Sequence, residues 1–320
     1  MKSDILKTIF SLNYIKNIII QNYNLMNINN IFLIKSGIND IYKIVSKENQ
    51  YIFKIYHYTK EINDLEIKVK FIHYLQSNNI LVSYPFKTIN NQYIISVNYP
   101  EGMRFAILTN FIKGSELTYK SDYDAYLYGR DIAKLHIVSK DFSLISKNKK
   151  YDIHQILINS QTIIENFLSK NYPNHLLFFS KFSRKLLRKL NNLNLTQQYC
   201  HNDLHGGNVK INKKNISFFD FDFCGYGYII YELAVFKWSC MIGNRPTNWE
   251  QFIKGYESIL KINTMELKYI LYFVAIRDII IMSMYINRIN IIGHEIISDT
   301  YIEKRIIFLK YINKKLEGEE

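Results

Sequence analysis

The chain has 320 residues, of which 48% are hydrophobic and 22% are charged. This length predicts about two domains or lobes, and the composition excludes an intrinsically disordered chain. The formal net charge of +13 is compatible with an anionic partner, but lysines spread over a solvated surface explain it more simply.

The three cysteines are Cys200, Cys224 and Cys240. Their number is odd, and no two of them have the Cys-x-x-Cys spacing that is typical of zinc and redox motifs. A disulfide framework or a zinc knuckle is therefore not expected, and the cysteines fit a protein of a reducing compartment.

Residues 1–30 contain charges and many asparagines but no small-residue cleavage site, so they do not predict a secretory signal. The longest apolar stretch, 269–286, is interrupted by Arg277 and Asp278. It lacks the roughly 18 uninterrupted apolar residues of a membrane-spanning helix and therefore predicts a buried core helix. We expect a soluble cytoplasmic protein without a membrane partner.

The first third of the chain has the pattern of a small sheet with helices, because period-2 segments bounded by turn residues alternate with segments of helical period. The predicted elements are a helix at 1–25, three antiparallel strands within 30–58, a helix at 60–76, and strands at 86–97 and 104–112. Residues 1–112 are therefore expected to form a strand-rich lobe.

From Gly114 onward the pattern is mainly helical, with one strand-rich island at 199–222. The predicted helices span 121–139, 151–169, 173–191, 229–241, 249–260, 265–290 and 298–316. The fold class is therefore predicted to be α+β, with residues 113–320 as a larger, mainly helical lobe.

The segment 199–234 reads YCHNDLHGGNVKINKKNISFFDFDFCGYGYIIYELA. Asp203 and Asn208 are five residues apart, and Asp220 follows after a strand-length interval. Phosphoryl transfer needs a carboxylate to orient the acceptor hydroxyl and oxygen ligands for Mg²⁺. Kinases supply these groups with an Asp, an Asn five residues later and a second Asp on the next strand turn. The segment therefore predicts a phosphoryl-transfer site.

HNDLHGGN, followed by FFDFDFCGYG and YELA, resembles the aminoglycoside phosphotransferase and choline kinase superfamily, a relative of protein kinases. The resemblance covers roughly residues 30–290 and is most specific at 199–234. It implies a bilobal protein-kinase-like fold, with an antiparallel-sheet N-lobe and a helical C-lobe. It also implies ATP and Mg²⁺ as cofactors.

The resemblance also implies a role for each residue that matches the family pattern. Asp203 would be the catalytic base, Asn208 and Asp220 would be the metal ligands, and His201 would support the loop. Three roles stay open for Asp222: a hydrogen-bond partner near the site, a second metal ligand, or a capping carboxylate.

Two positions depart from the family pattern. Asn202 stands where the family usually has Gly, and Glu232 stands where it usually has Asp. The first change would alter the backbone angles of the loop, although Asn tolerates unusual angles better than most residues.

Lys54 lies in the apolar strand YIFKIYH. An ammonium group buried there needs an anionic partner, and the family's ATP-phosphate lysine has this kind of position; the alternative is a lysine on the solvent face of an edge strand. One strand earlier, SGINDIY would cover the phosphates with Ser36 and Gly37, although a single glycine is by itself a weak nucleotide signal.

The helix at 60–76 should offer a glutamate that holds Lys54, and Glu66 is our candidate. Glu61 is the alternative, although its charge would also favour the helix dipole. The register of the apolar residues would instead place the family's glutamate near Lys68, so the pairing is not fixed by the pattern.

The segment ILTNFIKG at 107–114 resembles the family's hinge, where backbone groups bind adenine. Counting back from Gly114, Asn110 and Ile112 would supply those backbone groups. Because the backbone does the binding, the identities of these side chains carry little information.

The leading functional hypothesis is an ATP-dependent kinase that transfers the γ-phosphate to a hydroxyl of a small molecule, either an antibiotic or an amino-alcohol-type metabolite. The positive net charge and the few acidic clusters in the helical half disfavour a polycationic aminoglycoside. The alternatives are a bacterial stress-response-type Ser/Thr protein kinase and a non-catalytic nucleotide-binding pseudokinase. No motif supports a nucleic-acid partner. The sequence leaves open the identity of the acceptor, the choice between ATP and GTP, and the oligomeric state.

Overall fold

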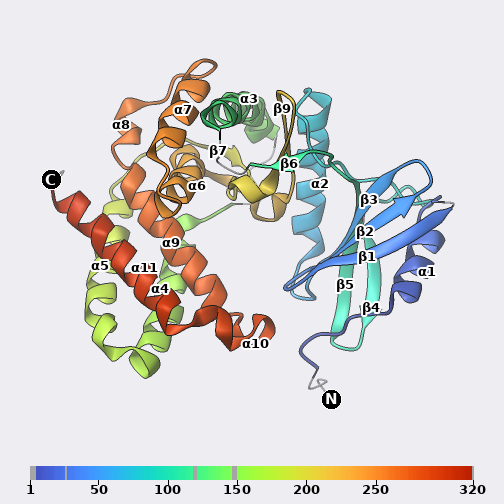
Figure 1. Ribbon diagram of the computed structural model, residues 1–320, viewed down its shortest axis with the longest axis horizontal. Coiled ribbons are helices and arrows are strands. Elements are labelled where there is room, and N and C mark those ends of the chain that lie inside the picture. The colour runs from blue at the N-terminus through green and yellow to red at the C-terminus, as the bar shows by residue number, and fades with distance from the viewer. Residues whose placement is uncertain (1–4, 26, 118–120, 146–149, 319–320) are drawn as a thin grey trace. The chain divides into compact units, whose positions relative to one another are not determined.

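The computed structural model describes residues 5–25, 27–117, 121–145 and 150–318. The chain divides into two compact units (Figure 1): Met1–Gly114 with Ser217–Asp220 form unit 1, and Ser115–Ile216 with Phe221–Glu320 form unit 2. The predicted lobes assigned Ser217–Asp220 to the second half. These residues belong to unit 1 because Phe218 exchanges backbone hydrogen bonds of 2.8 and 2.9 Å with the segment around Leu81.

Unit 1 contains one antiparallel sheet with strand order β1-β2-β3-β5-β4 and two helices. Its elements are α1 (Leu12–Asn22), β1 (Ile28–Ser36), β2 (Asp40–Ser46), β3 (Gln50–Ile55), α2 (Ile62–Ser77), β4 (Ile95–Tyr99) and β5 (Gly102–Asn110). The three strands predicted within 30–58 and the helix predicted at 60–76 are confirmed.

The two helices cover opposite faces of this sheet. Phe53 and Ile55 of β3 are fully buried in a core with Ile15 and Ile19 of α1. Successive side chains of a strand point to opposite faces, so Lys54 points to the other face. There α2 packs Leu65 and its neighbour residues into a second, smaller core. Lys54 therefore lies on the α2 side of the sheet.

The strand predicted at 86–97 is wrong for most of its length, because β4 begins only at Ile95. Residues before it form a turn in which the Thr88 N–H donates to the Gln92 carbonyl at 2.7 Å. Asn91 in this turn has φ +62°, a left-handed conformation that Asn adopts more readily than most residues. The asparagines at 90 and 91 favour a turn, but the strand prediction followed the apolar alternation around them instead.

Unit 2 is mainly helical and includes the small sheet β7–β10 and most of the sheet β6-β8-β9, whose strand β9 ends in the Ser217–Asp220 segment of unit 1. Its helices are α3 (Asp122–Ile145), α4 (Ile153–Asn171), α5 (Pro173–Asn191), α6 (Ile229–Ile242), α7 (Pro246–Glu257), α8 (Thr264–Leu267), α9 (Ile270–Ile286), α10 (Ile289–Ile292) and α11 (Asp299–Glu317). The strands are β6 (Ser115–Glu116), β7 (Gln197–Cys200), β8 (Val209–Asn212), β9 (Asn215–Phe218) and β10 (Gly225–Tyr228), with short 3₁₀ turns η1 (Gly206–Asn208), η2 (Phe221–Phe223) and η3 (His294–Ile297). The predicted α+β fold class is confirmed.

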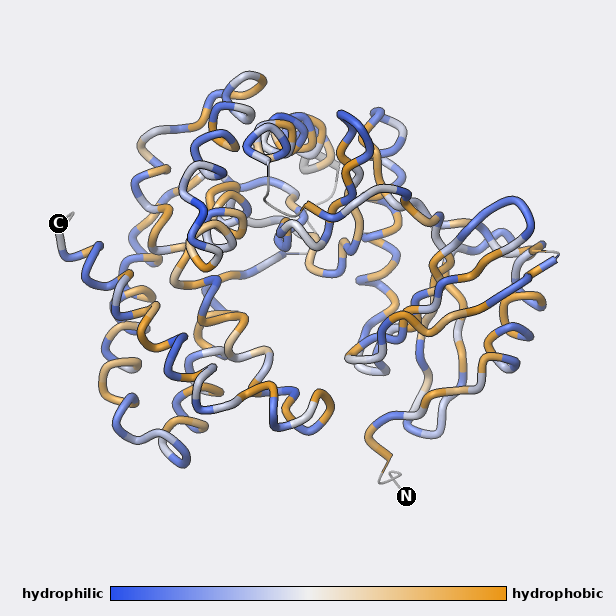
Figure 2. Tube along the Cα trace, viewed as in Figure 1, coloured by the Kyte–Doolittle hydropathy of each residue, from blue (hydrophilic) through white to orange (hydrophobic). Residues whose placement is uncertain are grey.

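The apolar stretch predicted as a core helix is α9, and its buried side chains pack with those of α4, α6 and α11. The helix predicted at 265–290 is divided, because α8 ends at Leu267 and α9 begins at Ile270. Hydropathy along the chain shows apolar and polar segments alternating in the surrounding helices (Figure 2). Within the described residues, no helix has the length and apolar character needed to cross a membrane.

Helices α3 and α7 pack at a glycine contact. A Cβ on Gly129 would lie 1.9 Å from the Phe252 carbonyl oxygen, and one on Gly255 would lie 1.9 Å from the Tyr126 oxygen. We therefore expect Gly129→Ala to lower the free energy of unfolding by about 1–3 kcal/mol, because overpacking forces the helices apart. Chemical denaturation would measure this change. Gly318→Ala is the control, since its nearest atoms lie at 3.7 Å, and an equal loss in both variants would contradict the prediction.

Candidate active site

The segment with the predicted catalytic residues connects β7 to β8. β7 pairs antiparallel with β10, and the Asn202 side chain donates to the carbonyls of Phe223 and Gly225 at 3.2 Å. Asn202 is fully buried and has φ +63°. This is a left-handed conformation, which Asn adopts more readily than most residues other than Gly.

The Asp203 carboxylate is held from three directions. Oδ1 accepts a hydrogen bond from Arg277 Nη2, Oδ2 accepts one from Asn208 Nδ2 at 3.0 Å, and His205 Nε2 lies 3.8 Å from Oδ2. The side chain keeps only 12% of its surface exposed. Asp203 is therefore a fixed carboxylate, which suits a group that must orient a hydroxyl.

Asn208 is tied to Asp203 twice, because its amide nitrogen also donates to the Asp203 carbonyl at 2.9 Å. The amide oxygen is then the atom that would bind a cation. The turn η1 sets this spacing: the His205 N–H donates to the Asp203 carbonyl, and the Asn208 N–H donates to the His205 carbonyl, both at 2.9 Å. The five-residue interval predicted between the two side chains thus corresponds to one compact turn.

Arg277 was not among the predicted site residues. It comes from α9, is 3% exposed, and its guanidinium lies 5.6 Å from the Trp238 ring centre. Burial, the largest single influence, lowers the pKa of Arg277, but the Asp203 carboxylate together with Tyr231 and Tyr151 outweighs burial and raises this pKa above its usual value. Arg277 therefore stays charged and neutralises the carboxylate. The one signal in the sequence was a charged residue inside an apolar helix.

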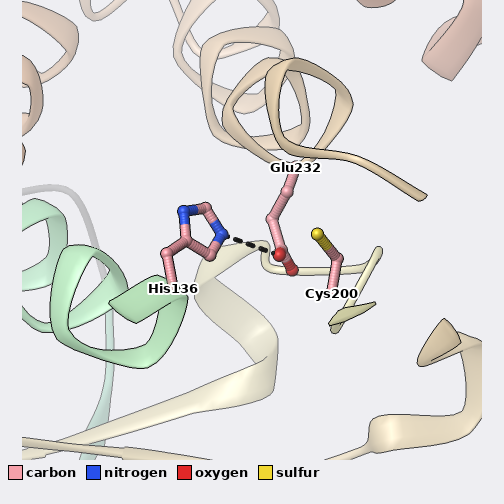
Figure 3. Close-up of side chains that lie close together, drawn as sticks. All are labelled: His136, Cys200 and Glu232. Atoms are coloured by element: carbon pink, nitrogen blue, oxygen red, sulfur yellow. Dashed lines mark hydrogen bonds and ion pairs between the residues drawn. The ribbon is translucent and has the colours of Figure 1, made fainter. Parts of the chain in front are cut away.

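A buried hydrogen-bond network anchors the same loop, and Figure 3 shows the pair that His136 and Glu232 form within it. The Glu232 carboxylate, on α6, accepts hydrogen bonds from the backbone N–H groups of His201 and Asn202 at 3.3 and 2.9 Å and from His136 Nε2 at 2.9 Å. His136 Nδ1 in turn bonds the Tyr256 hydroxyl at 2.7 Å. Glu232, noted in the sequence only as a departure from Asp, therefore positions the loop that leads to Asp203.

His136, Cys200 and Glu232 offer ligand atoms that lie within 4.8 Å of one another. This proximity does not make them a metal site, because His136 and both Glu232 oxygens are already hydrogen-bonded. Burial raises the pKa of Cys200, and the nearby Glu232 carboxylate raises it further, so the neutral thiol is favoured over the thiolate that binds metals. The cluster is a structural support.

We expect Glu232→Gln to lower the free energy of unfolding by about 3 kcal/mol, because backbone donors and His136 would lose a buried carboxylate. Burial raises the pKa of Glu232, but its hydrogen bonds from His136 and Asn202 lower it below 4.5 overall. Its stabilising effect is therefore present above pH 4.5 and is lost as the pH falls through the folded-state pKa. Urea denaturation between pH 3 and 7 should show a weaker acid dependence in the variant.

The His175–Glu303 pair is the control for this prediction. It is also a His–Glu pair, at 2.6 Å, but half of the Glu303 side chain is exposed. Glu303→Gln should therefore change the free energy of unfolding by less than about 1 kcal/mol. If the two variants lose equal stability, Glu232 does not have the anchoring role described.

In unit 1, Lys54 Nζ lies 2.6 Å from Asp220 Oδ1. Asp220 has φ +63°, an unfavourable conformation for Asp that recurs at functional positions. The sequence predicted both residues as site residues but did not pair them. The anionic partner expected for the strand lysine is Asp220, which lies 166 positions away in the chain.

The predicted phosphate-covering loop is tied to the N-terminal segment. Lys7 Nζ contacts Ser36 Oγ at 2.9 Å and the Gly37 carbonyl at 2.6 Å, and it forms an ion pair with Asp40 at 2.5 Å. The Ser36 hydroxyl donates to the same Asp40 carboxylate. Arg104, 1% exposed, bonds Asp40 from the other side at 2.8 Å. The Ser36 hydroxyl is thus engaged in a structural network, and phosphate binding by this loop stays a prediction.

The prediction that Glu66 holds Lys54 is wrong. Glu66 lies on the exposed side of α2, whereas Lys68 is 5% exposed and turns toward the sheet. The apolar stripe of α2 decides this register, because Lys68 is three residues after buried Leu65 and next to buried Val69. The alternative register noted in the sequence, near Lys68, is the one that faces inward.

Asn110 is the last residue of β5, and its backbone is already bonded. Its N–H donates to the Tyr84 carbonyl at 3.2 Å, and its carbonyl accepts from the Ser83 hydroxyl at 3.0 Å. The N–H is thus engaged within the fold, whereas the carbonyl oxygen has a second lone pair, and the part of Asn110 in adenine binding stays a prediction. Ile112 follows β5 and is half-buried, and its part in adenine binding stays a prediction.

An antiparallel-sheet unit with a strand lysine, together with a helical unit that holds an Asp–Asn turn, defines a kinase-like phosphotransferase. The sequence profile of the phosphotransferase enzyme family matches residues 33–266, and the chain belongs to this family. Amicoumacin kinase of Bacillus subtilis is 22% identical over 279 residues, covering 80% of each chain.

Two solved structures extend this similarity. An amicoumacin kinase in complex with AMP-PNP, Ca²⁺ and Ami has a TM-score of 0.75 at 17% identity and covers 96% of this chain and 94% of its own. A microcompartment-associated aminopropanol kinase has a TM-score of 0.67 at 16% identity, covering 94% and 95%. The predicted protein-kinase-like fold and superfamily are confirmed, and the chain is a member of a phosphotransferase enzyme family.

Proposed function

We propose that the chain is an ATP-dependent kinase that transfers the γ-phosphate to a hydroxyl of a small molecule. The observation that carries the proposal is the turn in which Asp203 is fixed by Arg277 and Asn208. The Lys54–Asp220 pair gives independent support, because it joins a cation suited to phosphates with a carboxylate suited to a metal ion.

In this proposal Asp203 accepts a hydrogen bond from the acceptor hydroxyl and takes its proton as the new O–P bond forms and the bond to ADP breaks. Arg277 and Asn208 hold the carboxylate in one orientation, which fixes the direction from which it can accept this hydrogen bond. Catalysis is then mostly a matter of positioning, as is usual for phosphoryl transfer. Lys54 would align the phosphates.

Asn208 and Asp220 are the proposed ligands of Mg²⁺. Their oxygen atoms are the hard donors that this ion prefers, and Asp220 keeps 33% of its side chain exposed, so a cation can reach it. When bound, the ion would neutralise charge on the phosphates. Asp220 would then bind the metal ion in place of Lys54, and the Lys54 ammonium group would be available to the phosphates of the nucleotide.

The acceptor is proposed to be an antibiotic or an amino-alcohol-type metabolite rather than a polycationic aminoglycoside. Buried carboxylates of unit 2 already have positive partners: Asp203 has Arg277, and Asp278 has Arg305 at 2.7 Å. They therefore offer little to a substrate with several amino groups. The compounds named in similar proteins, amicoumacin and aminopropanol, define a first set of candidates.

The test is ADP release with ATP and Mg²⁺ in the presence of amicoumacin, aminopropanol, spectinomycin or choline. We expect at least one compound to raise ADP release above the rate without acceptor, and mass spectrometry to find one added phosphoryl group. GTP in place of ATP reports nucleotide preference. Failure to bind either nucleotide would contradict the proposal.

A further inference from the structure

Helix α2 places a lysine where its apolar stripe would otherwise continue. Leu65 and Val69 pack in the core on the α2 face of the sheet, Ile72 is also buried, and Lys68 lies among them in the helix at 5% exposure. An ammonium group held in such a position is expensive unless charge or polar contacts compensate it. Lysine is normally found on the solvated side of such a helix, so Lys68 needs an explanation beyond packing.

Lys68 and Lys54 approach the same aromatic ring. Lys68 Nζ lies 4.2 Å from the Tyr56 ring centre and donates to the Tyr56 hydroxyl, while Lys54 Nζ lies 5.2 Å from that centre. Both ammonium groups are on the α2 face of the sheet. Because both distances are measured to the same ring centre, the two Nζ atoms are no farther apart than the sum of these distances. Asp220, ion-paired with Lys54, belongs to the same corner.

Tyr56 is a rigid support for the two lysines. It follows β3 directly, its N–H donates to the Phe105 carbonyl at 2.8 Å, and its own carbonyl accepts from Arg104 Nε at 2.7 Å. The side chain is buried at 3% exposure. Neither ammonium can therefore shift far without losing a contact with the ring.

The charges of this corner favour a polyanion. Lys54, Lys68 and Asp220 together carry a formal charge of +1, and a metal ion on Asp220 would make it more positive. A chain of phosphates presents several negative oxygens along its length, which suits two separated ammonium groups better than a single carboxylate does.

We propose that Lys68 is a second phosphate-binding cation of the enzyme, which acts with Lys54 on the phosphate chain of the nucleotide. This inference rests on the proposed function, since it places the nucleotide in unit 1. It assigns to α2 a direct contact with the ligand in place of the Lys54–glutamate pair expected from the family.

The test compares Mg²⁺–AMP-PNP and AMP by isothermal titration calorimetry, which needs no acceptor. Lys68→Met should weaken AMP-PNP binding about 10- to 100-fold, because a hydrogen bond to a charged group is lost, and should leave AMP binding nearly unchanged. Lys68→Glu should weaken AMP-PNP binding further. If Lys68 merely occupied a glutamate position, Lys68→Glu would pair with Lys54 and retain or improve binding.

Two controls separate the possible results. Lys70→Met alters an exposed lysine of the same helix and should bind AMP-PNP normally. Lys54→Met should weaken binding under the proposed function itself. Normal binding by Lys68→Met together with weak binding by Lys54→Met overturns this inference alone, whereas normal binding by both overturns the proposed nucleotide site.

Thermal unfolding of each variant checks that the fold is retained. If Lys68→Met does not fold, Lys68→Arg and Lys68→Gln decide the question. The arginine variant should bind AMP-PNP within a few-fold of the original chain, and the glutamine variant should show the loss. Equal binding by these two variants contradicts a role for the charge.

Discussion

Replacing Asp203 with asparagine should reduce phosphoryl transfer about 10²- to 10⁴-fold, the usual contribution of a positioned acid–base group. Asparagine has nearly the same shape and can still accept from Arg277, but it cannot take a proton from the acceptor hydroxyl. The measurement is acceptor-dependent ADP release at saturating ATP. A near-normal rate in the variant would remove Asp203 from the role of base.

Stability must be measured beside the rate. Arg277 is 3% exposed and would lose its anionic partner in this variant. Breaking such a buried pair lowers the free energy of unfolding by about 3–5 kcal/mol. The double variant Asp203→Asn/Arg277→Gln removes both charges, so it should recover part of this stability and still lack transfer.

Asp131→Asn is the matched control. Asp131 lies on α3, its side chain is 12% exposed, as is that of Asp203, and it pairs with Arg130 and Lys134 at 2.8 and 2.9 Å. This variant should lose some stability but keep the transfer rate. A comparable loss of transfer in both variants would point to a general effect of disrupting buried ion pairs.

Replacing Asp220 with asparagine should lower transfer by at least about 10²-fold at a fixed Mg²⁺ concentration, because the charged metal ligand becomes neutral. The fold should be retained, since Asn tolerates the φ of +63° at this position better than Asp does. A titration of rate against Mg²⁺ is the measurement, and the half-saturating concentration should rise. An unchanged titration curve would mean that Asp220 does not bind the metal.

Asp64→Asn is the control for this change. Asp64 is also in unit 1, pairs with Lys60 at 3.1 Å, and is 38% exposed, against 33% for Asp220. The Mg²⁺ titration of Asp64→Asn should match that of the original chain. The contrast isolates metal binding from the general effect of losing one surface carboxylate.

The local part of the site could be predicted from the sequence because it depends on short spacings. Asp203 and Asn208 are joined by a single turn, so a spacing of five residues is enough to bring their side chains together. The strand-rich and helical halves followed from periodicity for the same reason. The positive φ of Asn202 was not predicted, although Asn was noted as a residue that tolerates unusual angles.

The remaining contacts depend on pairs far apart in the chain, which periodicity does not encode. Arg277 lies 74 positions from Asp203, and His136 lies 96 positions from Glu232. The Glu66 prediction was wrong because a shift of two residues moves a side chain from one side of a helix to the other. Lys68 faces inward only because Leu65 and Val69 set the register of α2.

The most direct test is a crystal structure of the chain with AMP-PNP and Mn²⁺, in which anomalous scattering locates the metal. We expect one Mn²⁺ bound by the Asn208 amide oxygen, an Asp220 carboxylate oxygen and the phosphates of the analogue, with Asp203 facing the terminal phosphate. Mn²⁺ bound to neither residue, or a nucleotide away from Lys54, would contradict the proposed phosphoryl-transfer site.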